Sequence, residues 1–282
     1  MLKIKRKVLK YKIFYPFGLA AAVLSIGFYR LTESPPVWYD EGIYFQMAAN
    51  FANFFRWGLQ TAPGHFVSAA QVTVGYPALL PIGVVFKIFG ASLLAGRAVM
   101  VFFMAATALA AYYLIKKQYG YKIAVASSLL LAAFPVFYGN GKNILGEVPG
   151  MFYLLLFFVF LQRVEVGKKN NYFDYIAAGL FGGLCVATKP TFIVLIPAFA
   201  LMAYFWRKKI NFQVKKAVFF GVFFVAPVIL WIITQFGLGS SPGSVFYFFY
   251  NPYAIQNIQT VLWQNFFRFF TEPSAIYFFG LF

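Results

Sequence analysis

Long apolar runs constrain this chain more than any other feature of its sequence. A helix that crosses a membrane needs about 20 mostly apolar residues, within a range of about 17–25. Seven runs reach or approach that length: residues 13–29, 98–115, 123–138, 148–161, 172–188, 191–206 and 217–236. The 282-residue chain is 62% hydrophobic and 11% charged, whereas soluble domains carry about 25% charged residues. We therefore predict an all-α, polytopic membrane helix bundle of about seven spans, and exclude a soluble globule and a disordered chain.

Basic residues are distributed unevenly along the chain, and this asymmetry predicts its orientation. If the N-terminus is cytoplasmic and the spans alternate, 17 of the 24 Lys and Arg residues fall on the cytoplasmic side, in residues 1–12, 116–122, 163–171 and 207–216. Five of the seven acids then fall outside: Glu33, Asp40, Glu41, Glu147 and Glu272. Cytoplasmic loops collect Lys and Arg, so this orientation explains the net charge of +17 without a nucleic-acid partner.

The predicted spans divide the chain into four parts. These are a basic cytoplasmic N-terminus at 1–12, a membrane module at 13–236 with an outer loop at 30–96, a second outer loop at 237–274, and the start of an eighth span at 275–282. We therefore expect the sequence to be part of a longer protein. Residues 76–89 are apolar, but a run of about 10–14 residues is more often interfacial or buried than spanning.

The outer loop at 30–96 is too long for a simple connection, and long loops are usually functional. Asp40 and Glu41 open a helical pattern that reaches about residue 57. A polar stripe follows one face of this pattern, at Gln46, Asn50, Asn53 and Trp57. Most other positions are apolar, so we expect an amphipathic helix in the membrane surface. The two acids are either ordinary helix-start residues, favoured there by the helix dipole, or functional carboxylates.

Three further charged residues lie at predicted outer span ends. Glu147 begins a span soon after Lys142, and Lys189 stands in a very short turn between two spans. Each has an ordinary explanation, because acids often begin helices and lysines near span ends reach toward the interface. Together they could instead form a polar site for an anionic ligand. Arg56 and Arg97 border the outer loop, where they could contact phosphates or lipid headgroups.

The order of these features resembles the N-terminal part of GT-C superfamily glycosyltransferases, in the branch of protein O-mannosyltransferases and lipid A aminoarabinose transferases. The resemblance covers about residues 10–205. The family's catalytic acidic motif in the first outer loop matches Asp40 and Glu41. Its basic residue followed five positions later by an acid matches Lys142 and Glu147, and its Thr-Lys-Gly-Pro-like element matches residues 188–190 without the glycine. Gly75-Tyr76-Pro77-Ala78 departs from the family, which often has a cation there.

The resemblance implies transfer of a sugar from a polyprenyl-phosphate donor to an acceptor hydroxyl at the non-cytoplasmic face. Asp40 is expected to act as the base, with inversion at the anomeric carbon. Lys142, Lys189 and Arg56 are the candidates for stabilising the phosphate leaving group. Alternatively, Glu147 with Asp40 or Glu41 could hold a divalent metal, Mg or Mn, through carboxylate oxygens. No cofactor is certain.

The expected partners are the membrane, the lipid-linked donor and a lipid, glycan or protein acceptor, with no nucleic acid. The expected location is a bacterial or archaeal cell membrane. One cysteine, Cys185, excludes an intramolecular disulfide, and one histidine, His65, excludes a His-cluster metal site. A transporter or lipid flippase, and a non-catalytic lipid-binding subunit, remain as alternatives. Donor-dependent product formation would distinguish the enzyme from both.

Overall fold

The computed structural model describes residues 2–70, 72–166, 171–194, 196–197, 214–237, 263 and 267. The chain divides into two compact units, Met1–Leu238 and Gly239–Phe282, and all helices and strands named below belong to the first. Most of the predicted span at 191–206 lies outside the described residues, as do nearly all of the predicted outer loop at 237–274 and the whole predicted span start at 275–282.

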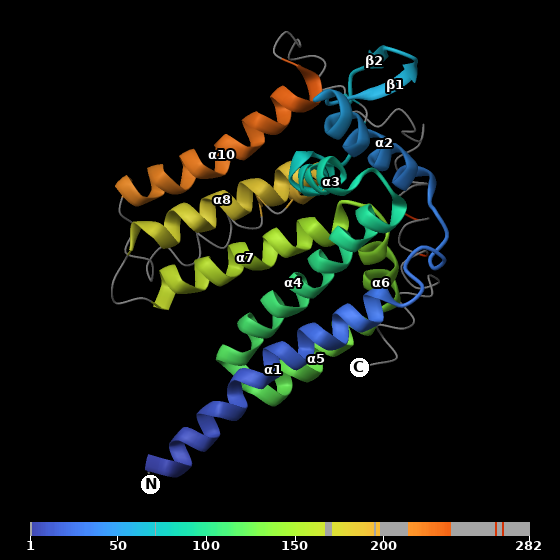
Figure 1. Cartoon of the computed structure of the whole chain (residues 1–282). Helices are drawn as coiled ribbons and strands as arrows, with labels where there is room; N and C mark the ends of the chain where they lie inside the picture. Colours follow the sequence, from blue (N-terminus) through green and yellow to red (C-terminus); the bar gives the residue numbers. More distant parts are fainter. Residues whose placement is uncertain are drawn as a thin grey trace. The chain divides into compact units, whose positions relative to one another are not determined.

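Long helices dominate the first unit, as predicted (Figure 1). The elements in chain order are α1 (Leu2–Phe28), α2 (Tyr39–Phe54), β1 (Leu59–Ala62), β2 (His65–Val67), α3 (Tyr76–Phe89), α4 (Leu93–Tyr119), α5 (Tyr121–Ala133), α6 (Pro135–Lys142), α7 (Glu147–Val166), α8 (Tyr172–Thr188), the 3₁₀ helix η1 (Pro190–Val194) and α10 (Val214–Phe236). Helix α1 packs on α4 and α5, α4 on α7, α7 on α8, and α8 on α10. The bundle is therefore built as a row of neighbouring helices.

Several helices of the row have the character of membrane spans. By length and composition, Leu93–Tyr119, Glu147–Val164 and Val214–Phe236 are long and apolar enough to cross a bilayer. Helices α5 and α6 are long and apolar enough for a span only when taken together, and they are bent by 66° at the break between them. The prediction of one continuous span at 123–138 is therefore wrong. The break falls at Phe134, whose ψ of 122° is extended, because the residue before a proline avoids the helical region.

Helix α3 does not run along the row. Figure 1 shows it end-on, while α4, α7 and α8 run across the view. Pro77 stands in its first turn, where a missing N–H costs nothing. One side of α3 packs on α2 and another on α4 and α8. The segment at 76–89 is therefore a short crossing helix with one buried side, and Leu80, Val84, Ile88 and Phe89 are exposed; that it does not span the membrane stays a prediction.

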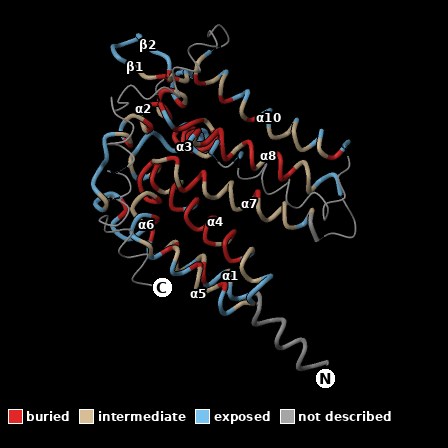
Figure 2. Tube along the Cα trace, turned by 180° about the vertical axis from the view of Figure 1, so that it is seen from behind, coloured by how far each residue is buried: buried red, intermediate tan, exposed pale blue. Residues whose placement is uncertain are grey.

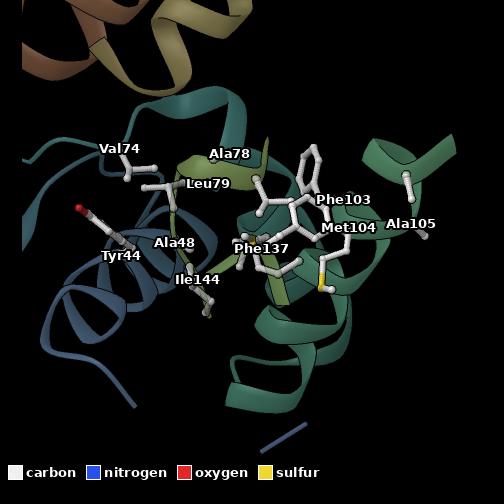
Figure 3. Close-up of a cluster of buried hydrophobic side chains, with 14 of the residues drawn as sticks. Tyr44, Ala48, Val74, Ala78, Leu79, Phe103, Met104, Ala105, Phe137 and Ile144 are labelled. Carbon is white, nitrogen blue, oxygen red and sulfur yellow. The ribbon is translucent and has the colours of Figure 1, made fainter. Parts of the chain in front are cut away.

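The main apolar core lies between α2, α3, α4 and the turn that precedes α7. Figure 3 shows Ala48 of α2, Leu79 of α3, Met104 of α4 and Ile144 of the turn in this cluster, with Tyr44 of α2 at its edge. Figure 2 shows buried stretches on α2, α3, α4 and α8. Helix α10, by contrast, exposes apolar side chains along its length, at Val214, Val218, Val222, Val225, Ile229 and Ile233. Such a surface suits contact with lipid.

A glycine pair brings α8 and α10 into close contact. A Cβ added at Gly179 would overlap the backbone carbonyl of Phe220, and one at Gly183 would overlap that of Phe224. Two small residues four positions apart allow helix backbones in membranes to approach in this way. This contact fixes the course of α10, which brings Gln235 to the outer-loop segment described below.

Contacts between helix ends show that the bundle has two chemically different ends. Lys189 of the turn after α8 pairs with Glu147 of α7, and Lys142 of α6 reaches the end of α1. At the opposite end, Lys216 of α10 lies over Tyr172 of α8. We call these the acidic end and the basic end. Besides the basic first turns of α1, the basic end carries Lys116, Lys117, Lys122, Arg163, Lys215 and Lys216. That this end faces the cytoplasm stays a prediction.

Candidate functional site

Asp40 lies in the first turn of α2 at the acidic end, and its carboxylate is available for chemistry. The helix N-cap is Trp38, whose side chain makes no capping bond, so Asp40 is not the N-cap residue. Its side chain is half-buried. Within the described part of the chain, Asp40 has no hydrogen bond or ion pair. The helix dipole stabilises a negative charge in this first turn.

Glu41, the next residue, has the opposite environment. Its side chain is fully buried in an ion pair with Arg97 of α4, with Arg97 Nε donating to Oε1 at 2.8 Å and Nη2 to Oε2 at 2.7 Å. The backbone N–H of Ile144 donates to Oε1 at 3.1 Å. Arg97 Nη1 donates to the carbonyls of Leu31 at 2.7 Å and Pro35 at 2.9 Å. Glu41 therefore anchors α2 to α4 and to the turn before α7.

The sequence predicted a lipid-headgroup or phosphate contact for Arg97, whereas the structure makes it the partner of Glu41. A signal for this existed in the sequence. Arg97 lies within the second turn of a long apolar helix, and a guanidinium buried in apolar surroundings needs a counter-charge. The chain has only seven acids to supply it. Which acid does so depends on long-range packing, since Glu41 and Arg97 are 56 residues apart in sequence.

Glu147 and Lys189 form a second ion pair at the acidic end. Lys189 Nζ donates to Glu147 Oε1, which joins the start of α7 to the end of α8. The Glu147 and Lys189 side chains are 37% and 19% exposed, so the pair is accessible in part. The second carboxylate oxygen of Glu147 is buried and finds no hydrogen-bond donor among the described residues. The pair thus offers one accessible cation and one carboxylate oxygen with unused capacity.

An extended loop at 72–75 lies beside this pair. The N–H of Gly75 donates to the carbonyl of Thr188 at 2.9 Å, which places the loop against the residue before Lys189. A Cβ at Gly75 would overlap the carbonyl oxygen of Ala187, so only glycine allows this approach. On the other side of the loop, the hydroxyls of Thr73 and Tyr44 lie 2.9 Å apart. The loop therefore links α8 to α2.

Tyr44 lies near two half-buried carboxylates of the acidic end, Asp40 and Glu147. Burial raises the pKa of its phenol to about 12, and the negative charges of Asp40 and Glu147 add to the increase, while the hydrogen bond to Thr73 opposes it. Both carboxylates must therefore act on the same phenol. Tyr44 lies one turn after Asp40 on α2, and its hydroxyl meets that of Thr73 in the loop that contacts α8. Sequence reasoning had not identified Tyr44 or Thr73.

Two of the expected phosphate-binding residues lie elsewhere. Lys142 is fully buried, where its Nζ donates to the Tyr29 carbonyl at 2.7 Å and to Tyr138 Oη at 2.9 Å. Arg56 is exposed beyond the C-terminal end of α2, with its guanidinium 5.6 Å from the Phe66 ring centroid. At 1.5 Å per residue, that end lies about 20 Å from Asp40. Neither cation contacts Asp40 or Glu147 in the described structure.

The polar stripe of α2 also has a protein partner. Asn50 Nδ2 donates to the Gly58 carbonyl at 2.9 Å, and Gln46 Nε2 donates to the Gln60 carbonyl at 3.2 Å. The stripe thereby holds the start of the β1–β2 hairpin against the helix.

Among the described residues, no group of three or more His, Cys, Asp or Glu side chains comes together. The arrangement is suited to proton transfer by Asp40 and to anion binding by Lys189.

Comparison with known proteins places this arrangement in a family. The model of the dolichyl-phosphate-mannose-protein mannosyltransferase family matches residues 78–231, which is more than half of the chain. The match includes Glu147 and Lys189 and begins after Asp40. Comparison with curated protein sequences gives no significant match.

Two crystal structures of ArnT from Cupriavidus metallidurans share the fold. The apo structure has a TM-score of 0.60 and 13% identity, and the match covers 89% of this chain and 46% of that one. The structure bound to undecaprenyl phosphate has a TM-score of 0.55 and 14% identity, with 76% and 41% covered. This chain thus spans less than half the length of either structure. With the family match and the shared fold, the chain belongs to the dolichyl-phosphate-mannose-protein mannosyltransferase family, within the GT-C superfamily that its sequence resembles.

Proposed function

We propose that the protein transfers a sugar from a polyprenyl-phosphate donor to an acceptor hydroxyl at the acidic end of the bundle. The observation that carries the proposal is a partly exposed carboxylate and a partly exposed cation at the same end of the bundle: Asp40 lies one turn before Tyr44 on α2, Tyr44 bonds Thr73, and the loop of Thr73 contacts the residue before Lys189. This is the minimum that inverting transfer from a phosphate leaving group requires: one base and one group that stabilises developing negative charge.

The donor class rests on the family and on the fold. The family is named for dolichyl-phosphate mannose, and one ArnT structure holds undecaprenyl phosphate. Both are polyprenyl phosphates, whose tails can stay in the bilayer beside apolar helices such as α10 while the phosphate reaches the acidic end. Lys189 is the cation we assign to the phosphate, because its ammonium is partly exposed and is already oriented by Glu147.

Asp40 is the base in this proposal. The acceptor oxygen attacks the anomeric carbon, its proton passes to the Asp40 carboxylate, and the bond from the anomeric carbon to the phosphate oxygen breaks. The polyprenyl phosphate leaves with the electron pair, and attack opposite the leaving group inverts the carbon. We assign Glu41 and Lys142 to holding the site in place. A metal on Asp40 and Glu147 would compete with Lys189 for Glu147, so chelation with EDTA should leave transfer unchanged.

Sugar transfer by the full-length protein in detergent tests the proposal, with dolichyl-phosphate mannose as the first donor. Asp40→Asn should lower the rate by about 10²–10⁴-fold, as expected for loss of a catalytic base, without changing the unfolding temperature. Glu33→Gln is the matched control, since Glu33 lies in an exposed ion pair with Arg30 outside the site. Asp40→Asn protein that transfers sugar at the wild-type rate would remove Asp40 from the mechanism. Movement of an unmodified lipid without product would favour a flippase.

The proposed orientation places the acidic end on the non-cytoplasmic side of the membrane. The 17 of 24 Lys and Arg residues in the predicted cytoplasmic segments support it, because Lys and Arg accumulate on cytoplasmic surfaces. Cysteines introduced as Glu33→Cys and Lys117→Cys can be labelled in intact cells with a membrane-impermeant maleimide. Labelling should occur at position 33 and not at 117, and the reverse pattern would contradict the orientation.

A further inference from the structure

The hydroxyl pair of Tyr44 and Thr73 has no role in the chemistry assigned above, although it lies among the residues that carry it. We propose that Thr73, oriented by Tyr44, hydrogen-bonds a hydroxyl group on the sugar ring of the donor and so helps to select the sugar. This inference rests on the proposed function, because it needs a sugar bound between Asp40 and Lys189. It adds a specificity-determining residue in a part of the chain that the family match does not cover.

The burial of the two residues indicates the direction of their hydrogen bond. Tyr44 is 3% exposed, whereas Thr73 is exposed. If Thr73 donated to Tyr44, the phenolic proton would need a second acceptor in buried surroundings, and none is seen for it among the described residues. An unmatched buried donor is costly. The favoured arrangement therefore has Tyr44 donating to Thr73 Oγ1 at 2.9 Å.

This arrangement leaves the Thr73 hydroxyl proton and a lone pair free on the exposed side. The phenol stays protonated at any physiological pH, because burial holds its pKa well above the usual value, so it remains a donor. Thr73 can then both donate and accept one hydrogen bond. That capacity matches a sugar hydroxyl, which also does both, better than a phosphate, which accepts only and has Lys189 nearby.

The loop that carries Thr73 is held on both sides. Before Thr73, the side-chain amide of Gln235, itself 1% exposed, donates to the carbonyls of Ala69 and Val72. After it, Gly75 donates to the Thr188 carbonyl. Because the loop is already ordered, binding of a ligand to this hydroxyl loses little conformational entropy of the loop. Because Thr188 directly precedes Lys189, the bond from Gly75 holds the loop of Thr73 next to the cation that we assign to the phosphate.

Binding measurements with two matched lipids test the inference. The full-length protein in detergent is titrated with dolichyl-phosphate mannose and with sugar-free dolichyl phosphate. Thr73→Val and Tyr44→Phe, which each remove one hydroxyl and keep the side-chain shape, should weaken binding of the mannose lipid by about 3- to 10-fold, as for one neutral hydrogen bond. Neither should change binding of dolichyl phosphate, which also serves as the control for correct folding.

Two further variants sharpen the test. Thr73→Ser keeps the hydroxyl and should bind both lipids as wild type does, and the double variant should be no weaker than either single one, since both remove the same interaction. Equal effects on the two lipids, no effect on either, or a Thr73→Ser protein as weak as Thr73→Val would overturn the inference while leaving Asp40-dependent transfer intact. Wild-type protein that binds neither lipid and transfers no sugar would overturn the proposed function as well.

Discussion

Replacing Glu41 with alanine measures how strongly the buried ion pair holds α2, and with it Asp40, in place. The Glu41 carboxylate accepts three hydrogen bonds, two from Arg97 and one from the N–H of Ile144, and both charged side chains are completely buried. Removing the acid leaves the guanidinium buried without a counter-charge. Loss of one partner of such a pair costs about 3–5 kcal/mol.

Thermal unfolding of the purified protein in detergent is the assay. For a protein of this size, a loss of that magnitude corresponds to an unfolding temperature lower by on the order of 10 °C. Asp40→Ala is the matched control, because it removes the adjacent acid, which has no partner among the described residues, and should shift the temperature by no more than about 2 °C. The combined change Glu41→Leu with Arg97→Met should be less destabilising than Glu41→Ala, since it leaves no unpaired buried charge.

Two results would refute this reasoning. One is a Glu41→Ala protein that unfolds within about 2 °C of wild type. The other concerns the double variant Glu41→Leu with Arg97→Met. Its loss of stability should differ from the sum of the losses of Glu41→Leu and of Arg97→Met, because the two residues are coupled, and an equal loss would refute the reasoning. Sugar transfer should also fall in Glu41→Ala below its unfolding temperature, since Asp40 then loses the anchor that positions its helix.

Three further predictions follow from other contacts. Gly183→Ala should destabilise the protein by about 1–3 kcal/mol, because the added Cβ overpacks against the Phe224 carbonyl. Gly221→Ala is the control and should leave the stability unchanged, because a Cβ there meets open space. Thermal unfolding of the two variants tests this difference. Lys189→Met should lower transfer by about 10²–10³-fold through loss of the cation at the leaving phosphate, with part of the activity kept by Lys189→Arg. The pKa of Tyr44 is raised to about 12 from 10.0, so on raising the pH the phenol ionises first in the unfolded protein. The free energy of unfolding should therefore fall between about pH 10 and 12, by up to about 2–3 kcal/mol. In Tyr44→Phe, the fall over this pH range should be smaller by the same amount.

Local sequence pattern was sufficient for the helical class and for most helix positions. The run at 172–188 coincides with α8, and the run at 217–236 lies within α10, because length and apolar composition determine which segments can form membrane helices. The break before Pro135 was also readable from the sequence, since the residue before a proline resists helix. It was missed because the apolar run continues through it.

The division of roles between two adjacent acids was decided only by the tertiary structure. The sequence placed Asp40 and Glu41 together at the start of a helix, and the family resemblance named Asp40 as the base without giving Glu41 a role of its own. Neighbouring residues on an α-helix point about 100° apart, so the two carboxylates face different surroundings once the helix packs. The contact of α2 with Arg97 and Ile144 turns Glu41 inward, while Asp40 has no hydrogen-bond or ion-pair partner among the described residues. Such contacts join residues far apart in the chain, and local pattern carries no information about them.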